Sequence, residues 1–311
     1  MGRLIKRLLL FGAAVALIYV ASMFIMIKVP VMGTPLIFRT GDYYNLPGGH
    51  SWQRFHEFDP AKRWDAVIIG SSHAYRGYDP SVFAAHGHHA FNLGSSAQTP
   101  LNSYYVIEHY LDSTNCGLLI FDVFEGSLQN TGLESTADLT QNVTSDGAAW
   151  GMAWALRDLR GLNMMALRMI SRPTEPDYTN SDYVGLGYAV KTDSVGTEAG
   201  PPSKKPVELF ERQRHFLEAC IQLCRDRGIP LVITSHYARS NMRGEAHEVL
   251  AQYMDSILTG TSIPYLDYTD TPGIEDRYWF FDHNHLNATG ARIFTTELVD
   301  TLESLGYLRK P

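Results

Sequence analysis

Cysteine is scarce in this sequence, which excludes a protein held together by disulfides. The three cysteines are Cys116, Cys220 and Cys224, and an odd number provides no disulfide framework. Cys220 and Cys224 are four residues apart in a segment that reads as a helix, so they share one face. A metal site on this pair would need a histidine or a second cysteine pair at a matching spacing, and none is present. Small buried hydrophobic residues are the better interpretation of the pair.

Positive charge is in deficit as well. The formal net charge is −7 and no basic stripe is present, so nucleic acid is not expected as a partner. The simplest interpretation of the charge is solubility. Two motifs are also absent: a G-x-S-x-G elbow and a P-loop. Their absence disfavours an α/β-hydrolase of the usual kind and a nucleoside triphosphatase.

A long uncharged run near the N-terminus predicts a membrane segment. No charged side chain occurs from Leu8 to Ile27, and a helix of that length rises about 30 Å, the thickness of a bilayer core. Arg3, Lys6 and Arg7 precede the run, and positive charges favour the cytoplasmic side. We therefore predict an anchor over residues 1–30 in the inner membrane of a bacterium, crossing once, with the rest of the chain in the periplasm or outside the cell.

A cleaved signal peptide is the alternative interpretation of the same run. The run is long for a signal peptide, and apolar residues continue from Met23 to Ile27, past any small-residue site near Ala21. These features favour the anchor. Both interpretations place the following domain outside the cytoplasm.

The rest of the chain reads as an α/β domain. Residues 31–62 show no clear periodicity and are interpreted as a linker and an edge elaboration. From residue 63 onward, short apolar runs alternate with helical stretches, which implies a parallel sheet covered on both faces. The expected strands are Asp65–Gly70, His89–Gly94, Gly117–Asp122, Ile229–Thr234 and Ile263–Asp267; the expected helices are Asn102–Leu111, Pro206–Arg227, Glu245–Leu258 and Ala288–Leu305.

A segment at about 125–205 interrupts the alternation and is too long for a plain loop. Residues Ala148 to Ile170 predict one or two helices, and residues Asp177 to Gly200 are rich in Tyr, Gly, Asp and Ser. We interpret the segment as an insertion into the domain of residues 63–311. It is either a lid or substrate-binding element, or surface decoration that packs against the sheet.

The first expected strand ends in Gly70-Ser71-Ser72-His73. A serine just past a parallel strand lies exposed at the carboxyl edge of the sheet, and its N–H can face an oxyanion formed there. The alternative is a plain turn with serine as a helix N-cap. The second strand ends in Asn92-Leu93-Gly94, where the N–H of Gly94 is a candidate second donor.

The third candidate motif lies before the last helix. His285 could take the proton of Ser72 as a general base, and Asp282, three residues earlier, could orient the imidazole and stabilise its charged form. The alternative is a helix N-cap region in which Asn287 caps the helix and the acid and the imidazole lie in solvent.

These three motifs, in this order along the chain, resemble the SGNH or GDSL-like hydrolase superfamily. The resemblance covers roughly residues 65–124 and 229–305. It implies a flavodoxin-like three-layer α/β/α sandwich with a five-stranded parallel sheet. It also implies Ser72 as nucleophile, Ser72 and Gly94 as N–H donors of the oxyanion hole, and Asp282 and His285 as the remaining catalytic pair.

Two positions depart from the superfamily pattern. Ser71 stands where the usual first motif has Asp, and the segment Asp122–Gly126 lacks the Asn that usually completes the oxyanion hole. A carboxylate cannot donate to an oxyanion unless it is protonated. Asn130 and His236 are candidate donors on position alone.

The Gly-Ser-Ser form behind a single anchor is more similar to a DltD-like or alginate-acetylation-like subset, whose members are associated with acyl transfer onto cell-surface polymers. This likeness implies an acylated glycan or another ester as substrate, and a multi-span membrane acyltransferase as a possible partner.

Other polar residues near the motifs are weaker candidates. His73 and Arg76 follow the nucleophile and are possible substrate contacts, although Arg76 could equally pair with Asp79 as a structural contact. His86, His88 and His89 are close together in sequence without nearby carboxylates, and a polar loop is the better interpretation. We predict neither a metal nor a cofactor.

The expected function is that of a serine-dependent esterase or O-acyltransferase that acts through an acyl-Ser72 intermediate. A protein of another class remains open: a non-catalytic envelope binding or scaffold protein on the same fold.

Overall fold

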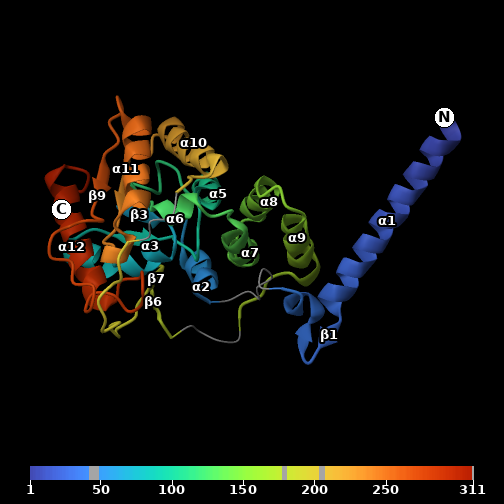
Figure 1. Ribbon diagram of the computed structural model, residues 1–311, viewed down its shortest axis with the longest axis horizontal. Helices are drawn as coiled ribbons and strands as arrows, with labels where there is room; N and C mark the ends of the chain where they lie inside the picture. The colour runs from blue at the N-terminus through green and yellow to red at the C-terminus, as the bar shows by residue number, and fades with distance from the viewer. Residues whose placement is uncertain (42–48, 177–180, 203–206, 310–311) are drawn as a thin grey trace.

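The centre of the computed structural model, which describes residues 1–41, 49–176, 181–202 and 207–309, is a five-stranded sheet (Figure 1). Every neighbouring pair of strands is parallel. Because the chain starts in the middle of the sheet and adds strands first on one side and then on the other, the topology is flavodoxin-like. The strands, in spatial order, are β4 (Ala90–Asn92), β3 (Ala66–Ile69), β5 (Leu119–Asp122), β8 (Leu231–Ser235) and β9 (Tyr265–Asp267). All five predicted strands are confirmed.

Both faces of the sheet are buried, because successive side chains of a strand point to opposite faces. On β3, Val67 and Ile69 join one hydrophobic cluster, while Ala66 and Ile68 join the other. Helices α5 (Pro100–Tyr110), α10 (Glu211–Arg227) and α11 (Glu245–Leu258) contribute to the first cluster; α4 (Pro80–Ala85), α12 (Ala288–Ser304) and the short α3 (Ser72–Gly77) contribute to the second. The predicted three-layer sandwich is confirmed.

The helix boundaries agree with the sequence signals where these are strong. Helix α10 ends at Arg227, and Gly228 follows with φ +64° as a left-handed C-cap. Its predicted start at Pro206 lies outside the described residues, and the described helix begins at Glu211. All three cysteines are free and buried, and burial raises the pKa of the Cys224 thiol to about 12.

The stretch predicted as a linker contains a helix that the sequence analysis did not identify. A small hairpin of β1 (Pro30–Val31) and β2 (Thr34–Pro35) and a 3₁₀ turn, η1 (Leu36–Arg39), precede α2 (Gly49–Glu57). Helix α2 buries Trp52, Phe55 and also Arg54, which donates to the carbonyl of Gly187 at 3.0 Å. Because the polar Arg54 lies among the apolar residues of the buried face, the sequence of α2 lacks the continuous apolar stripe that predicts an amphipathic helix.

Between β5 and α10 the described residues, 123–176, 181–202 and 207–210, add no strand to the central sheet. The predicted helical region proves to be two helices, and the later part includes a short antiparallel hairpin. The elements are α6 (Glu125–Leu128), α7 (Leu133–Asn142), α8 (Asp146–Ala155), α9 (Leu159–Ser171), β6 (Tyr183–Gly185) and β7 (Tyr188–Ala189). The predicted range Asp177–Gly200 is described except for residues 177–180 and contains this hairpin.

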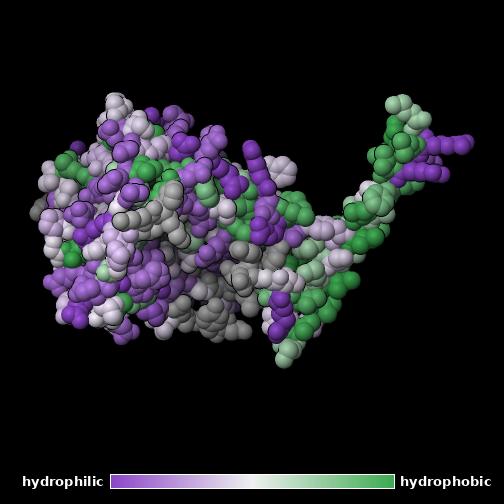
Figure 2. Space-filling model, in the orientation of Figure 1, coloured by the Kyte–Doolittle hydropathy of each residue, from purple (hydrophilic) through white to green (hydrophobic). Residues whose placement is uncertain are grey.

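The N-terminal helix α1 (Gly2–Lys28) extends away from the rest of the molecule (Figure 1). It is hydrophobic along most of its length, with hydrophilic side chains near its start (Figure 2). Among the described residues it is the one helix long and apolar enough to cross a membrane. Near its end, Met23 and Ile27 pack against Leu167 of α9.

Candidate active site

Ser72 is the first residue of α3, two residues after the turn glycine that follows β3. Ser71 is the N-cap, and its hydroxyl accepts from the N–H of His73 at 3.3 Å. Gly70 has φ +149°, and a Cβ there would lie 2.9 Å from atoms of Ala74 and Asp122. Only glycine fits this turn, and the turn places Ser72 at the carboxyl edge of the sheet.

The structure brings Ser72, His285 and Asp282 into one hydrogen-bonded chain. The Oγ of Ser72 lies 2.7 Å from Nε2 of His285, and Nδ1 of His285 lies 2.8 Å from Oδ2 of Asp282. The other oxygen of Asp282 accepts the backbone N–H groups of Asn284 and His285 at 2.9 and 2.8 Å. A hydroxyl, an imidazole and a carboxylate therefore meet from two segments more than 200 residues apart, in the arrangement that a Ser-His-Asp triad requires.

Neighbouring aromatic rings orient the imidazole of His285, and burial favours its neutral form. Its ring stacks on Phe281 at 5.4 Å and on His73 at 4.9 Å between ring centroids. Burial lowers the pKa of His285 below its ordinary value, although Asp282 acts in the opposite direction. A neutral imidazole can accept the serine proton. Phe281 was not identified from the sequence, where it is one aromatic residue among many.

Asp282 is held in its ionised form. Partial burial alone would raise the pKa of its carboxyl group, but the hydrogen bonds from Asn284 and His285 outweigh burial, and the net pKa is lowered. A carboxylate that stays charged can stabilise the imidazolium that forms when His285 takes a proton.

The N–H of Gly94 does not point to the pocket as the sequence predicts. It donates to the side-chain oxygen of Asn92 at 3.0 Å, and Gly94 is not among the residues that line the cavity at Ser72. Glycine is required there for a different reason: a Cβ would lie 2.9–3.0 Å from Ala74, Gly70 and Ser71. Gly94 thus allows its strand end to pack closely against the nucleophile turn.

Of the donors expected from the sequence, the N–H of Ser72 and the side chain of Asn130 remain as candidates for an oxyanion at Ser72. The backbone N–H of Ser72 has no acceptor among the hydrogen bonds of the described residues. Asn130 lines the same cavity, and its Oδ1 accepts the N–H of Gly132 at 2.9 Å. That bond fixes the carboxamide and leaves its Nδ2 available to donate.

His236, the other candidate donor, does not line the cavity. It is buried, and its Nδ1 lies 2.8 Å from Asp122, which also accepts the hydroxyl of Tyr78 at 2.6 Å. The ring of His236 stacks on His73 at 4.2 Å. A second ring contact joins His236 to Phe124 at 5.9 Å between centroids. His236 therefore contacts the cavity lining through the rings of His73 and Phe124, while the buried carboxylate of Asp122 holds its Nδ1.

Arg76 and His73 both line the cavity. Burial, together with the nearby His236 and His285, lowers the pKa of His73 well below its ordinary value, so this ring is neutral. Arg76 lies 3.7 Å from Asp182, which belongs to the segment between β5 and α10. The alternative pairing of Arg76 with Asp79 is wrong, because Asp79 caps α4 by accepting the N–H of Ser81.

The cavity at Ser72 has a volume of about 430 Å³ and mixes hydroxyl, amide and charged groups with three aromatic rings. Its lining residues come from four places: the turn at Ser72, the segment after β4, the stretch from Phe124 through α6 to the start of α7, and the loop before α12. The aromatic residues are Tyr75, Phe124 and Phe281; the polar ones beyond the triad include Ser96, Gln98, Ser127, Asn130 and Glu134.

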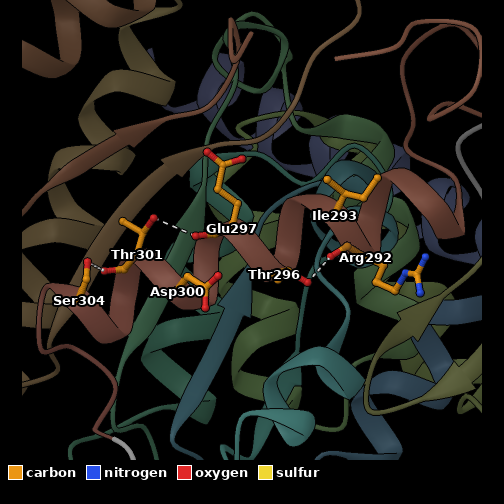
Figure 3. Close-up of a pocket in the computed structure, with 7 residues that line it drawn as sticks. All are labelled: Arg292, Ile293, Thr296, Glu297, Asp300, Thr301 and Ser304. Atoms are coloured by element: carbon orange, nitrogen blue, oxygen red, sulfur yellow. Dashed lines mark hydrogen bonds between the residues drawn. The ribbon is translucent and has the colours of Figure 1, made fainter. Parts of the chain in front are cut away.

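A second surface hollow lies on α12 and has no comparable chemistry (Figure 3). Its lining residues belong to one face of a single helix. Three of their hydroxyls, on Thr296, Thr301 and Ser304, donate to carbonyls of the same helix. Polar groups that are satisfied within one helix do not converge on a ligand.

Comparisons with known proteins found similarity only among solved structures. No protein-family model matches the chain, and no curated protein matches it. A lipase/acylhydrolase from Enterococcus faecalis is 12% identical, covers 79% of this chain and 98% of its own, and has a TM-score of 0.41. A GDSL-like lipase from Bacteroides thetaiotaomicron is 12% identical, covers 77% and 88%, and has a TM-score of 0.39.

An acetylxylan esterase from Geobacillus stearothermophilus is also similar, at 9% identity, with 81% and 100% coverage and a TM-score of 0.41. The descriptions of these solved structures name a lipase/acylhydrolase, a GDSL-like lipase and an acetylxylan esterase.

Proposed function

We propose that this chain is a serine-dependent esterase or O-acyltransferase of the SGNH type, which acts on acyl esters of an envelope glycan or a similar polar substrate. The observation that carries the proposal is the hydrogen-bonded chain from Ser72 through His285 to Asp282 at 2.7 and 2.8 Å. A serine on a surface turn needs no such partners, whereas an activated nucleophile needs both of them.

In the first half of the reaction, Nε2 of His285 takes the proton of Ser72 while Oγ forms a bond to the ester carbonyl carbon. The carbonyl oxygen becomes an oxyanion, held by the N–H of Ser72 and by Nδ2 of Asn130. When the oxyanion collapses, the ester C–O bond breaks, and the leaving alkoxide takes the proton from His285. The product is an acyl group on Ser72 and a free alcohol.

In the second half, a hydroxyl attacks the acyl-Ser72 carbonyl while His285 again takes the proton. Collapse breaks the bond to Ser72 Oγ, which recovers its proton from His285. If water attacks, the enzyme is an esterase; if a sugar hydroxyl attacks, it is an acyltransferase. The outcome depends on how well the bound acceptor excludes water from the pocket.

The lining of the cavity supports a polar substrate. Aromatic rings beside hydroxyl and amide groups suit a sugar, whose faces are apolar and whose edges carry hydroxyls. Arg76, 4.9 Å from the ring centroid of Phe281, adds a positive group to the lining, which suits an anionic sugar or a carboxylate. These features favour a glycan ester over a long aliphatic lipid.

The proposed location is the inner membrane of a bacterium, with the catalytic domain in the periplasm or outside the cell. Helix α1 is long enough to cross a bilayer, and Arg3, Lys6 and Arg7 at its start favour a cytoplasmic N-terminus. A domain held at the outer face of this membrane would reach acylated envelope polymers, and a multi-span acyltransferase in the same membrane could supply its acyl groups.

A non-catalytic scaffold is the second candidate, favoured by the segment Asp122–Gly126, which lacks the Asn that completes the oxyanion hole in the superfamily. The test supplies the full chain with an aryl acetate and an oligosaccharide acceptor and analyses both products. Acetylated sugar indicates transfer, and acetate alone indicates hydrolysis. A folded protein that yields neither product, or a Ser72→Ala variant as active as the unchanged chain, contradicts the proposal.

A further inference from the structure

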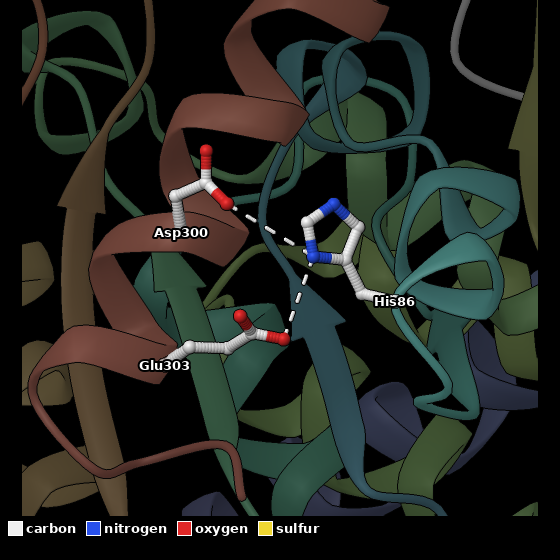
Figure 4. A group of neighbouring side chains, drawn as sticks. All are labelled: His86, Asp300 and Glu303. Carbon is white, nitrogen blue, oxygen red and sulfur yellow. Dashed lines mark ion pairs between the residues drawn. The ribbon is translucent and has the colours of Figure 1, made fainter. Parts of the chain in front are cut away.

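A second group of histidine and carboxylate side chains lies at the opposite edge of the sheet from Ser72. His86 follows α4 and His88 precedes β4, while Asp300 and Glu303 lie in the last turns of α12 (Figure 4). Helix α12 begins three residues after His285, and its rise of about 1.5 Å per residue puts Glu303 roughly 20 Å from the triad. The group is therefore separate from the active site.

The spacing of the three ligand atoms suits a metal ion better than a set of direct hydrogen bonds. Nδ1 of His86 lies 3.4 Å from Oε1 of Glu303 and 4.0 Å from Oδ1 of Asp300, beyond the usual hydrogen-bond range of about 2.7–3.2 Å. Zinc binds nitrogen and oxygen ligands at about 2.0–2.2 Å, so two ligands at a tetrahedral angle lie about 3.3 Å apart. The His86–Glu303 separation matches this spacing, and the longer His86–Asp300 separation would have to shorten when an ion binds.

The group brings one imidazole and two carboxylates together. Donor atoms of His86, Asp300 and Glu303 all lie within 4.8 Å of one another. A divalent ion bound among them would offset the repulsion between the two carboxylates. One imidazole nitrogen faces both carboxylates (Figure 4), and a metal bound at this nitrogen would contact an oxygen of each acid.

One acid of the group is buried and the other faces solvent, since the Asp300 side chain is 65% exposed. The Glu303 side chain is 8% exposed, and His88, 4% exposed, lies with Nε2 3.0 Å from the same Oε1. Such a contact to a ligating oxygen holds the ligand in orientation. On the solvent side, Asp300 and Glu303 line a surface hollow together with Ser304, Gly306, Leu308 and Arg309, which gives an ion a way in.

We propose that His86, Asp300 and Glu303 bind a divalent transition-metal ion, with Zn²⁺ the best fit, and that water completes the coordination. An imidazole nitrogen beside carboxylates favours Zn²⁺ over Mg²⁺ or Ca²⁺, which prefer oxygen ligands alone. The bound ion joins the end of α12 to the turn between α4 and β4. Its role is structural, because no nucleophile is part of the group.

The test is a titration of the full chain, freed of metal by a chelator and kept in detergent, with ZnCl₂ alone. We expect one Zn²⁺ per chain by calorimetry, a higher midpoint of thermal unfolding, and no such response to MgCl₂ or CaCl₂. His86→Ala and Asp300→Ala should each weaken the binding at least about tenfold, since each removes a ligand.

The matched control is His89→Ala, because His89 is exposed, pairs with Asp65 at 3.5 Å and lies outside the group. It should bind Zn²⁺ as tightly as the unchanged chain does. Ser72→Ala should also bind Zn²⁺ normally, which separates this proposal from that of the catalytic function. Absence of Zn²⁺ binding, or binding that survives the change at His86 in a folded protein, overturns the proposal.

Discussion

Two groups of histidine and carboxylate side chains lie at opposite edges of one sheet. Their different partners suggest a catalytic role for one group and a structural role for the other. At the carboxyl edge, His285 lies between the hydroxyl of Ser72 and the carboxylate of Asp282. At the other edge, His86 faces Asp300 and Glu303, with no nucleophile in the group. The residue types are similar, but only the first group opens onto a cavity with amide and hydroxyl donors around a serine.

The comparison shows that spacing and partner decide what a histidine can do. A hydrogen-bond distance of 2.7 Å to a hydroxyl permits proton transfer, whereas separations of 3.4 and 4.0 Å to carboxylates leave room for an ion. Changes in the first group should abolish activity, and changes in the second should alter stability only.

The largest effect is expected for Ser72→Ala. Loss of the nucleophile should lower kcat for an aryl acetate by roughly 10⁵- to 10⁶-fold, as for other nucleophiles that act as a unit with their base. The matched variant is Ser71→Ala, which removes the N-cap hydrogen bond to His73. It should cost about 1 kcal/mol of stability and retain most of the activity. Equal activity losses in the two variants would contradict the assignment of Ser72.

Asp282→Asn should lower kcat by about 10⁴-fold, because the imidazole loses its orienting and charge-stabilising partner. The pH profile provides a second readout. His285 acts as a base only when neutral and its pKa is lowered, so kcat/KM should fall on the acid side at a pH below about 6.5. Asp282 raises the pKa of His285, so in the Asp282→Asn variant the acid-side fall of kcat/KM should move to a still lower pH. A fall that does not move would contradict the pairing.

Asn130→Ala tests the second oxyanion donor. Loss of one donor should lower kcat by about 10²- to 10³-fold with little change in KM, because the bond forms only as the oxyanion develops. Ser127→Ala is the comparison, since Ser127 lines the same cavity but its hydroxyl donates to the carbonyl of Phe124. An unchanged kcat in the Asn130 variant would mean that another group holds the oxyanion.

The smallest effect on activity is expected at the second group. Without metal, Glu303→Ala leaves the buried His88 without its acceptor, which should lower the free energy of unfolding by about 1–3 kcal/mol. Esterase activity below the unfolding range should stay within about twofold. The exposed Glu248→Gln is a control for both measurements. A large activity loss in the Glu303 variant would contradict the separation of the two edges.

Much of the fold could be predicted from the sequence, because each central strand is an apolar run beside a glycine or a turn. The run Asp65–Gly70 contains β3, and residues 245–258 form α11 as predicted. Helix α2 could not be predicted, because its buried Arg54 is satisfied by the carbonyl of Gly187, far along the chain. A local sequence pattern cannot predict a hydrogen-bond partner that lies so far along the chain.

The same limit applied to the site. Ser72, Asp282 and His285 were identified because each follows a local motif, and the structure brings them together. The role of Gly94 as a donor could not be judged, because the competing acceptor is a side chain, Asn92, whose orientation depends on the folded turn. The grouping of His86 with Asp300 and Glu303 joins residues more than 200 positions apart, and no local pattern in the sequence links them.

The most direct test of the central claim is covalent labelling of the full chain by a fluorophosphonate, followed by mass spectrometry of its peptides. Only a serine activated by a base, beside oxyanion donors, reacts rapidly with such a probe. The label is expected on Ser72 and should be lost in both Ser72→Ala and His285→Ala. A folded chain that takes no label, or one that is labelled equally after Ser72 is replaced, would contradict the assignment of Ser72 as the nucleophile.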